Sequence, residues 1–175
     1  LVEKPLFSRV KKLRIKNNLV YVGYNLRFHP VIRKIKQEIK SQKIFNLNIQ
    51  NSSYLPSWRS NQNYSRSNSA QRAFGGGVLL EISHELDLLR YLFGDYKASY
   101  IFNQKISNLN INTDDILILI GKLGKSKKRV FNINLNFFSR INRREILIDT
   151  EEKSIYGDLI NANVRILTKN KNIRF

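Results

Sequence analysis

A histidine and a glutamate stand at helical spacing within residues 75–95, GGGVLLEISHELDLLRYLFGD. A helix over 75–94 would place Glu81, His84 and Leu88 on one side, because residues three or four apart share a helix face. An imidazole that titrates near neutral pH beside a carboxylate is suited to acid–base catalysis. Burying such a pair is costly unless it is partnered or used. The pattern therefore indicates either an acid–base site or a buried structural histidine.

The opposite side of the same helix is apolar and is expected to pack in the core. Its residues recur at alternating spacings of three and four, which is typical of a buried helix face. The three glycines at 75–77 lack the GxGxxG spacing of a dinucleotide-binding loop and are expected only to open the helix. The apolar residues are Leu79, Ile82, Leu86, Leu89 and Phe93.

Composition limits the class of protein. The chain has 175 residues with 42% hydrophobic content, enough for one domain with a real core. It has no cysteine and two histidines, which excludes disulfides, thiolate metal sites and a multi-histidine metal centre. No apolar run reaches the roughly 20 residues of a spanning helix, and the N-terminus lacks the pattern of a signal peptide. A cytoplasmic protein is expected.

The net charge of +18 could indicate an anionic partner such as nucleic acid. The Lys and Arg residues are scattered, however, and Asn and Ile are enriched with Lys, as an AT-rich coding bias would produce. Neither a helix-turn-helix pattern nor an RNP-type aromatic motif is present. A nucleic-acid-binding module is therefore kept only as the least favoured alternative.

The periodicity predicts an α+β fold: an open, mainly antiparallel sheet with helices packed on one face. A polar but aromatic-bearing loop is expected over 51–73, a length that is usually functional when it is not disordered. Helices are expected over about 6–16, from Pro30 to about Ile39, and over 75–94. Strands are expected at about 19–26, 44–50, 97–106, 115–122, 129–138, 144–150, 153–157 and 163–168.

The expected strand at 129–138 alternates cleanly between apolar residues and asparagines. Its outward row is uncharged in a chain rich in lysine, which is unusual for a solvated face. We therefore expect this side of the sheet to contact a second copy of the chain, giving a homo-oligomer. The inward residues are Phe131, Ile133, Leu135 and Phe137, and the outward residues are Asn132, Asn134 and Asn136.

Four motifs in order resemble the Gfo/Idh/MocA family of oxidoreductases: EKPL at 3–6, VGYNLRFHP at 22–30, YLPSWR at 54–59, and the helix at 75–94. The resemblance covers nearly the whole chain. It implies that residues 1–27 are the last loop, helix and strand of a truncated Rossmann domain that binds NAD(P). It also implies that residues 28–175 form the substrate-binding and oligomerisation domain. Whether that domain is complete at its C-terminal end is left open.

The resemblance also implies roles for residues in this chain. Lys4 matches the lysine that polarises the reacting hydroxyl or carbonyl, and His84 matches the histidine that exchanges a proton with the substrate. Glu81 stands three residues before His84, where the family has an aspartate, usually four residues before the histidine. A carboxylate there is expected to raise the pKa of His84 by favouring its charged form. Asp87 matches a trailing aspartate with a mainly structural role.

Further residues are expected to bind substrate or cofactor. By resemblance, Asn25 and Arg27 line the cleft, and the segment Glu3, Lys4 and Pro5 contacts the nicotinamide cofactor. Within the long loop, aromatic and basic side chains would suit a polyol that carries phosphates, although they could simply pin the loop. These loop residues are Trp58, Arg59 and Tyr64.

The resulting expectation is an NAD- or NADP-dependent oxidoreductase acting on a sugar, nucleotide sugar or cyclitol. The chain contains no GxGxxG unit to hold a dinucleotide, so we expect a fragment of a longer enzyme that is inactive alone. The alternative is a remnant that serves as a binding or assembly module without a cofactor.

Overall fold

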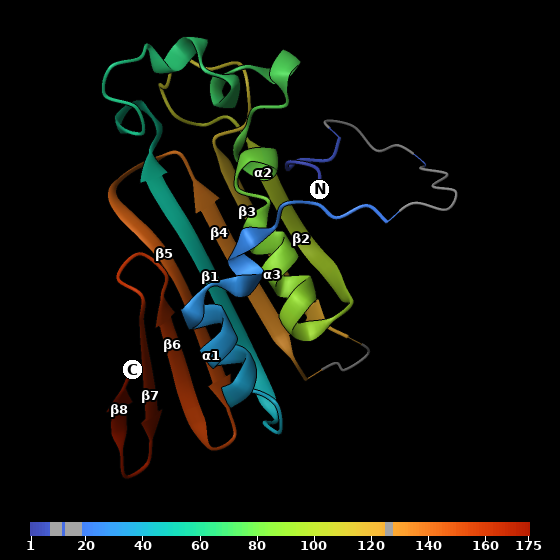
Figure 1. Ribbon diagram of the computed structural model, residues 1–175, viewed down its shortest axis with the longest axis vertical. Helices are drawn as coiled ribbons and strands as arrows, with labels where there is room; N and C mark the ends of the chain where they lie inside the picture. Colours follow the sequence, from blue (N-terminus) through green and yellow to red (C-terminus); the bar gives the residue numbers. More distant parts are fainter. Residues whose placement is uncertain (8–11, 13–18, 125–127) are drawn as a thin grey trace.

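The computed structural model describes residues 1–7, 12, 19–124 and 128–175, so the helix expected over 6–16 lies largely outside the described residues. Eight strands form one sheet in the order β2-β3-β4-β1-β5-β6-β7-β8 (Figure 1). The bounds are β1 Ile44–Tyr54, β2 Tyr96–Gln104, β3 Ile116–Leu123, β4 Val130–Asn136, β5 Phe138–Thr150, β6 Lys153–Asp158, β7 Asn163–Thr168 and β8 Asn172–Arg174.

Neighbouring strands are antiparallel except for β1 and β4, which pair in parallel. The mainly antiparallel open sheet expected from the sequence is therefore confirmed. Six of the expected strands agree with the structure within a few residues, and a seventh, expected over 144–150, is present as β5 but starts at Phe138. The short edge strand β8 was not expected, because three exposed residues carry no periodic signal.

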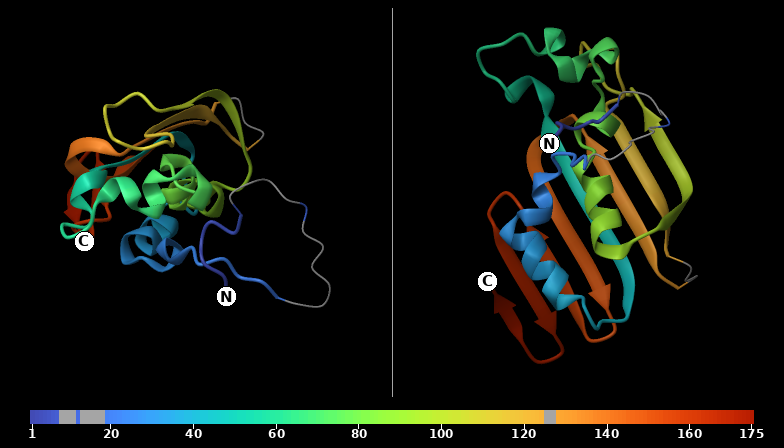
Figure 2. Two further views of the ribbon diagram at one scale, coloured as in Figure 1. Left: turned by 90° about the horizontal axis from the view of Figure 1, so that it is seen from above. Right: turned by 45° about the vertical axis from the view of Figure 1, so that its right-hand side comes forward.

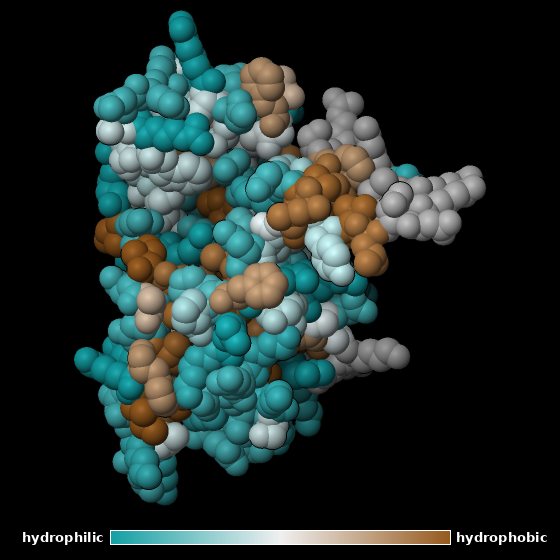
Figure 3. Space-filling model, viewed as in Figure 1, coloured by the Kyte–Doolittle hydropathy of each residue, from teal (hydrophilic) through white to brown (hydrophobic). Residues whose placement is uncertain are grey.

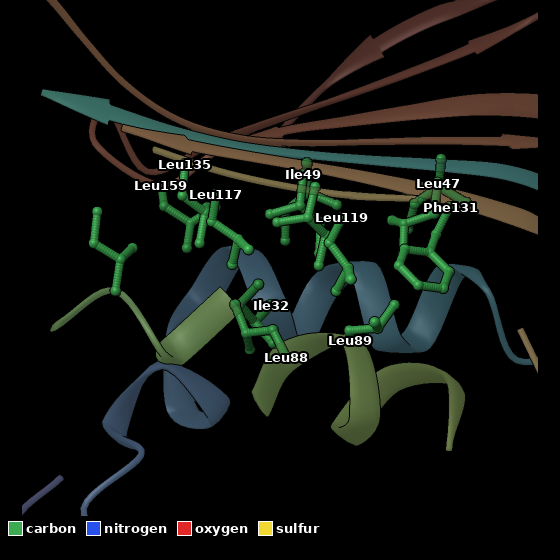
Figure 4. Close-up of a cluster of buried hydrophobic side chains, with 14 of the residues drawn as sticks. Ile32, Leu47, Ile49, Leu88, Leu89, Leu117, Leu119, Phe131, Leu135 and Leu159 are labelled. Carbon is green, nitrogen blue, oxygen red and sulfur yellow. The ribbon is translucent and has the colours of Figure 1, made fainter. Parts of the chain in front are cut away.

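The helices cover one face of the sheet, as the views in Figure 2 show. They are α1 (Pro30–Glu38), α2 (Val78–Glu81) and α3 (His84–Phe93). Figure 4 shows Ile32 of α1 and Leu88 and Leu89 of α3 pointing toward Leu47 and Ile49 of β1. All five are at most 2% exposed, so this layer is a packed core. No helix in the described part of the chain is long and apolar enough to cross a membrane.

The alternation predicted for β4 is present. Phe131, Ile133 and Leu135 are at most 1% exposed, because they face the helices. Asn132 and Asn134 lie on the uncovered face and are half-buried by neighbouring strands. Asn136, expected in the same outward row, is buried at 8% exposure, and its Oδ1 accepts from the Ser139 N–H at 3.0 Å. The two-residue period in the sequence therefore predicted correctly which side of β4 faces the helices.

The single helix expected over 75–94 is wrong. Gly77 has φ +106°, so α2 begins only at Val78, where the Asp114 backbone carbonyl accepts from the Val78 N–H. At Ile82 (φ −101°, ψ 32°) the chain leaves helical geometry, and α3 starts at His84. Ile82 is 4% exposed, so it packs in the core as expected even though the helix breaks there.

The strand expected over 19–26 is also wrong. Val22 forms a single parallel bridge with Val2, and the segment Asn25–Phe28 is a 3₁₀ helix. A strand is stable only when its backbone groups are paired along its length, and one bridge does not supply that. Leu19 therefore remains 85% exposed.

The long loop is shorter and more ordered than expected. Strand β1 continues to Tyr54, because its second half pairs with both β4 and β5. The remainder contains four short 3₁₀ helices, η2 Leu55–Ser57, η3 Tyr64–Arg66, η4 Asn68–Ala70 and η5 Arg72–Phe74.

Gly157 of β6 allows α1 to approach the sheet, and this contact can be tested. A Cβ atom there would lie 2.7 Å from Ile35 Cδ1 and 2.8 Å from Val31 Cγ1. We expect Gly157→Ala to lower the free energy of unfolding by about 1–3 kcal/mol through overpacking. Urea denaturation measures this change. Gly23→Ala is the control, since its Cβ would meet Val2 O at 3.5 Å; equal losses in both variants would contradict close packing of α1.

Candidate active site

A cavity of about 520 Å³ lies where the two central strands emerge from beneath the helices. Residues from five separate segments meet there, which local sequence patterns alone would not bring together. Its lining residues are Lys4, Asn51, Ser53, Tyr54, Ser57, Trp58, Glu81, Ile82, His84, Arg140, Asn142, Arg144 and Ile160.

Strand β1 supplies one half of the cavity floor. Leu47 and Ile49 are buried under the helices, and Asn51 and Ser53 follow on the same side, since side chains alternate along a strand. The same face of the strand is therefore apolar where helices cover it and polar where the cavity begins.

Strand β5 supplies the other half in the same way. Ile146 and Ile148 are at most 1% exposed beneath the helices. Arg140, Asn142 and Arg144 precede them on the same side of the strand and line the cavity. Two guanidinium groups on the core-facing side of a sheet are unusual, because charge is costly to bury without a partner.

Glu85, at the first turn of α3, is the partner of Arg144. Its Oε1 accepts from Arg144 Nε at 2.7 Å and from Asn51 Nδ2 at 2.9 Å. Asn51 and Arg144 are register partners on adjacent strands, so one carboxylate oxygen ties α3 to both. Glu85 is 1% exposed, and its position in the first turn favours a negative charge.

His84 lies beside this ion pair at the start of α3. Its ring meets Tyr24 edge-on at 5.6 Å between centroids, and its Nδ1 is buried without a hydrogen-bond partner among the described residues. Burial lowers the pKa of His84 to about 4, with smaller contributions from Arg144 and Lys4, while Asp87 opposes the shift. The expectation that Glu81 raises this pKa is therefore wrong. Glu81 is not among the charges that shift this pKa; desolvation and the two cations outweigh the carboxylate of Asp87, and His84 is neutral at pH 7.

Lys4 and Glu81 meet at the cavity wall although 77 residues separate them. Lys4 Nζ donates to the Glu81 backbone carbonyl at 2.6 Å and lies 3.4 Å from Glu81 Oε1. The peptide bond between Lys4 and Pro5 is cis. Lys4, Glu81 and His84, expected to act together, thus line one cavity.

The remaining segment near the N-terminus lies apart from this cavity. Arg27 donates from Nε to Asp87 Oδ2 at 2.8 Å and also lies over the Tyr91 ring, which fits the structural role expected for Asp87. Asn25 is exposed and, like Arg27, does not line the cavity. Glu3 is exposed, and its carboxylate lies near Gly23.

The loop residues divide between two places. Trp58 lines the cavity, where its Nε1 donates to Ser53 Oγ at 2.9 Å. Arg59 and Tyr64 instead line a separate small hollow beneath the loop. The Tyr64 hydroxyl accepts from the Asn110 backbone N–H at 3.0 Å, so this ring pins two loops together.

A larger hollow of about 770 Å³ lies along the opposite side of α2. Arg72, Lys105 and Asp114 contribute its charges, but the Asp114 carboxylate accepts from Leu79 N–H and Asn103 Nδ2, both at 2.9 Å. This hollow has no histidine, and its carboxylate is already used to hold α2. The smaller cavity is therefore the candidate active site.

Sequence reasoning missed the residues that build the cavity floor. Arg140 and Arg144 could have been found, because they continue the alternation of Ile146 and Ile148 toward the start of β5. Asn51 was assigned to a loop, and Glu85 was not distinguished from the other charges of its helix. No local pattern pairs Glu85 with Arg144, since 59 residues separate them.

Comparison with solved structures identifies the fold. UDP-N-acetylglucosamine 3-dehydrogenase from Acidithiobacillus ferrooxidans aligns with a TM-score of 0.66 at 16% identity, over 88% of this chain and 45% of that chain. Levoglucosan dehydrogenase in complex with NADH aligns with a TM-score of 0.70 at 18% identity, again over 88% and 45%. No protein-family model and no curated protein sequence matches the chain.

These solved structures are oxidoreductases of the Gfo/Idh/MocA type. The chain has the fold of their C-terminal domain. It spans about 45% of the length of these neighbours. The Gfo/Idh/MocA resemblance inferred from the four motifs is thus confirmed at the level of fold, and the roles of individual residues remain predictions.

The low pKa of His84 can be measured directly, because the chain contains only two histidines. We expect an NMR titration to place His84 near pH 4, and Lys4→Gln to raise that value by removing one cation that disfavours the imidazolium. His29 is the internal control: burial lowers its pKa too, but it caps α1 and lies outside the cavity lining. A value for His84 at or above 6.5 would contradict this account of its surroundings.

Proposed function

We propose that the chain is the substrate-binding part of an NAD(P)-dependent oxidoreductase that acts on a hydroxyl or carbonyl of a sugar, nucleotide sugar or cyclitol. The observation that carries the proposal is the meeting of Lys4, Glu81 and His84 in one cavity. The sequence motifs assigned these three residues to one site, and they come from distant parts of the chain. The fold shared with sugar dehydrogenases supports the same conclusion.

The chemistry follows from the protonation states. A neutral imidazole can accept the proton of a substrate hydroxyl, and His84 is neutral at pH 7. Its Nδ1 is buried, which leaves Nε2 for the substrate. The Lys4 ammonium would stabilise the oxyanion that develops as the proton leaves. Glu81 contacts Lys4 and would hold its amine at the cavity wall.

The reaction also needs a hydride acceptor, which a bound nicotinamide supplies and protein side chains do not. The segment Glu3 to Pro5 would contact it, since Lys4 lines the cavity and its neighbours extend outward from there. Large apolar side chains around this segment are exposed, as Figure 3 shows, and such patches mark surfaces that contact another protein part. A Rossmann domain packed here would cover Leu1, Val2, Leu19 and Val20.

The substrate assignment rests on the lining and on the neighbours. The levoglucosan dehydrogenase structures include complexes with levoglucosan and with L-sorbose. In this chain, the amides of Asn51 and Asn142 and the exposed indole of Trp58 offer hydrogen bonds and a flat apolar surface suited to a sugar ring. Arg59 and Tyr64 would contact only a substrate that extends beyond the cavity. The cytoplasmic location remains a prediction.

The test is kinetic and uses the complete enzyme that carries this chain, with NAD(P)H formation followed over a panel of sugars. We expect His84→Ala to lower kcat by about 10²–10⁴-fold, the usual value of a positioned acid–base group. Lys4→Ala should lower it by about 10²–10³-fold, like the loss of one oxyanion donor. The wild-type rate should fall only below about pH 5, because the imidazole stays neutral down to its pKa near 4.

Lys43→Ala is the matched control, because Lys43 pairs with Glu151 on the exposed surface away from the cavity. It should leave kcat unchanged. A His84→Ala enzyme with wild-type turnover and an unchanged pH profile would overturn the assignment. If the cavity binds a sugar but no hydride transfer occurs, the alternative of a binding module is correct.

We also propose that the uncovered face of the sheet pairs with a second copy. Across its middle, Ile120, Asn132, Asn48 and Leu147 stand side by side on neighbouring strands, with no charge among them. Ile120 is 43% exposed and Leu147 is half-buried, so this charge-free row leaves apolar surface in contact with water unless another molecule covers it.

Light scattering tests this proposal. The wild-type chain should have at least twice the mass of a monomer, and Asn132→Lys combined with Asn48→Lys should dissociate it by placing like charges at the centre. Asn170→Lys, in the exposed turn between β7 and β8, adds a charge elsewhere and should not. A wild-type chain that stays monomeric at high concentration would refute the pairing.

A further inference from the structure

Arg144 has donor groups that the fold does not use. Its Nε donates to Glu85, and its side chain is 27% exposed toward the cavity that it lines. A guanidinium has five N–H donors, so the pair with Glu85 leaves the two terminal nitrogens, which together can grip both oxygens of a carboxylate or phosphate. The ion pair thus fixes the guanidinium and leaves its outer edge available.

Arg140 stands four residues earlier on the same face of β5. Its guanidinium lies 3.4 Å from the centroid of the Tyr54 ring, which orients it over the cavity. No acidic side chain in the described part of the chain forms an ion pair with Arg140. Asn142 lies between the two arginines and also lines the cavity.

The negative charges near the cavity are already engaged. Glu81 is the only acidic residue among those that line it, and Lys4 lies 3.4 Å from its carboxylate. Glu85 lies beneath the floor, where Arg144 and Asn51 both donate to its Oε1, while its Oε2 is buried without a hydrogen-bond partner in the described part of the chain. The carboxylates of Glu81 and Glu85 are thus each paired with a cation, and an incoming anion would meet the guanidinium groups first. The direction of the His84 pKa shift agrees, since Arg144 contributes to it.

We propose that the substrate of this cavity carries an anionic group, a carboxylate or a phosphate monoester, which the terminal nitrogens of Arg144 bind with the help of Arg140. This inference rests on the proposed function and names its substrate class as anionic sugars or anionic cyclitols. Both Arg144 and His84 line the cavity, so the anionic group would be bound in the same chamber as the reacting hydroxyl. Arg144 then determines specificity, while His84 and Lys4 carry the chemistry.

Calorimetric titration of the 175-residue chain tests the proposal. The ligands are glucuronate, glucose 6-phosphate, glucose and inorganic phosphate, which separate a carboxylate from a phosphate and the anion from the sugar. We expect glucuronate or glucose 6-phosphate to bind about 10–100-fold more tightly than glucose, the value of charge-assisted hydrogen bonds. Inorganic phosphate should bind more weakly than the preferred anionic sugar.

Three variants locate the effect. Arg144→Lys keeps a cation for Glu85 but removes the two-pronged donor, and it should abolish most of the preference for the anionic sugar. Arg140→Gln should reduce the preference for the anionic sugar by a smaller factor. Because Arg140 is exposed, this variant also serves as the test if Arg144→Lys fails to fold. Arg143→Gln removes the same charge from the opposite face of β5 and should have no effect, since Arg143 does not line the cavity.

Three results would overturn the proposal. The first is equal affinity for glucose, glucuronate and glucose 6-phosphate, and the second is no binding of either anionic sugar. The third is an equal loss of affinity for the anionic sugar in Arg143→Gln and Arg140→Gln. The oxidoreductase proposal is judged separately. If the enzyme turns over neutral sugars in a reaction that depends on His84, the oxidoreductase proposal holds and the anionic-substrate proposal fails. If an anionic sugar binds through Arg144 but no hydride is transferred, the anionic-substrate proposal holds and the oxidoreductase proposal fails.

Discussion

The arrangement of the candidate active site depends on one buried carboxylate, that of Glu85. Asn51 and Arg144 donate to the same oxygen from adjacent strands, and Glu85 itself belongs to the first turn of α3. Breaking a buried pair by removing one partner costs about 3–5 kcal/mol, because the other charge is left uncompensated. The residue directly before Glu85 is His84, so the interaction that ties helix to sheet also sets where the imidazole lies.

The ion pair of Glu85 and Arg144 affects both the stability of the fold and the protonation of His84. Arg144 neutralises Glu85 from one side and raises the positive potential at His84 on the other, which helps to keep the imidazole neutral. A residue that serves both purposes cannot be exchanged for an apolar one without changing the protonation of its neighbour. The polar floor is therefore part of the fold and of the site at once.

The fold was largely predictable because its signals are local. Alternation set the orientation of β4, and the helix expected from Pro30 to about Ile39 is present as α1. The prediction failed where a distant partner decides the conformation. The segment around Val22 has a strand-like composition, but Val22 forms only one bridge, with Val2. The expected helix over 75–94 breaks at Ile82, where no Gly or Pro marks the break.

The site was predictable only in part for the same reason. Ordered motifs assigned Lys4, Glu81 and His84 to one site, and all three line the cavity. The pKa of His84 could not be predicted from residue spacing, because it depends on Arg144 of β5, and because Glu81 forms an ion pair with Lys4. Leu88, expected on the same helix face as the imidazole, is a core residue with 0% exposure.

The position of β1 limits the order in which this chain can assemble. β4 and β5 follow one another in sequence, yet β1 lies between them in the sheet, and the connection passes over its end, where the Leu55 N–H donates to the Phe137 carbonyl. Within the groups β2 to β4 and β5 to β8, each strand pairs with the strand next to it in sequence. Strand β1 instead pairs with β4 and β5, whose residues lie more than 75 positions away in the sequence. The entropy cost of closing such a loop comes before any gain from the contacts it brings, so we expect the pairing of β1 to slow folding. Because β1 carries Asn51 and Ser53, the cavity floor requires this strand to be paired between β4 and β5.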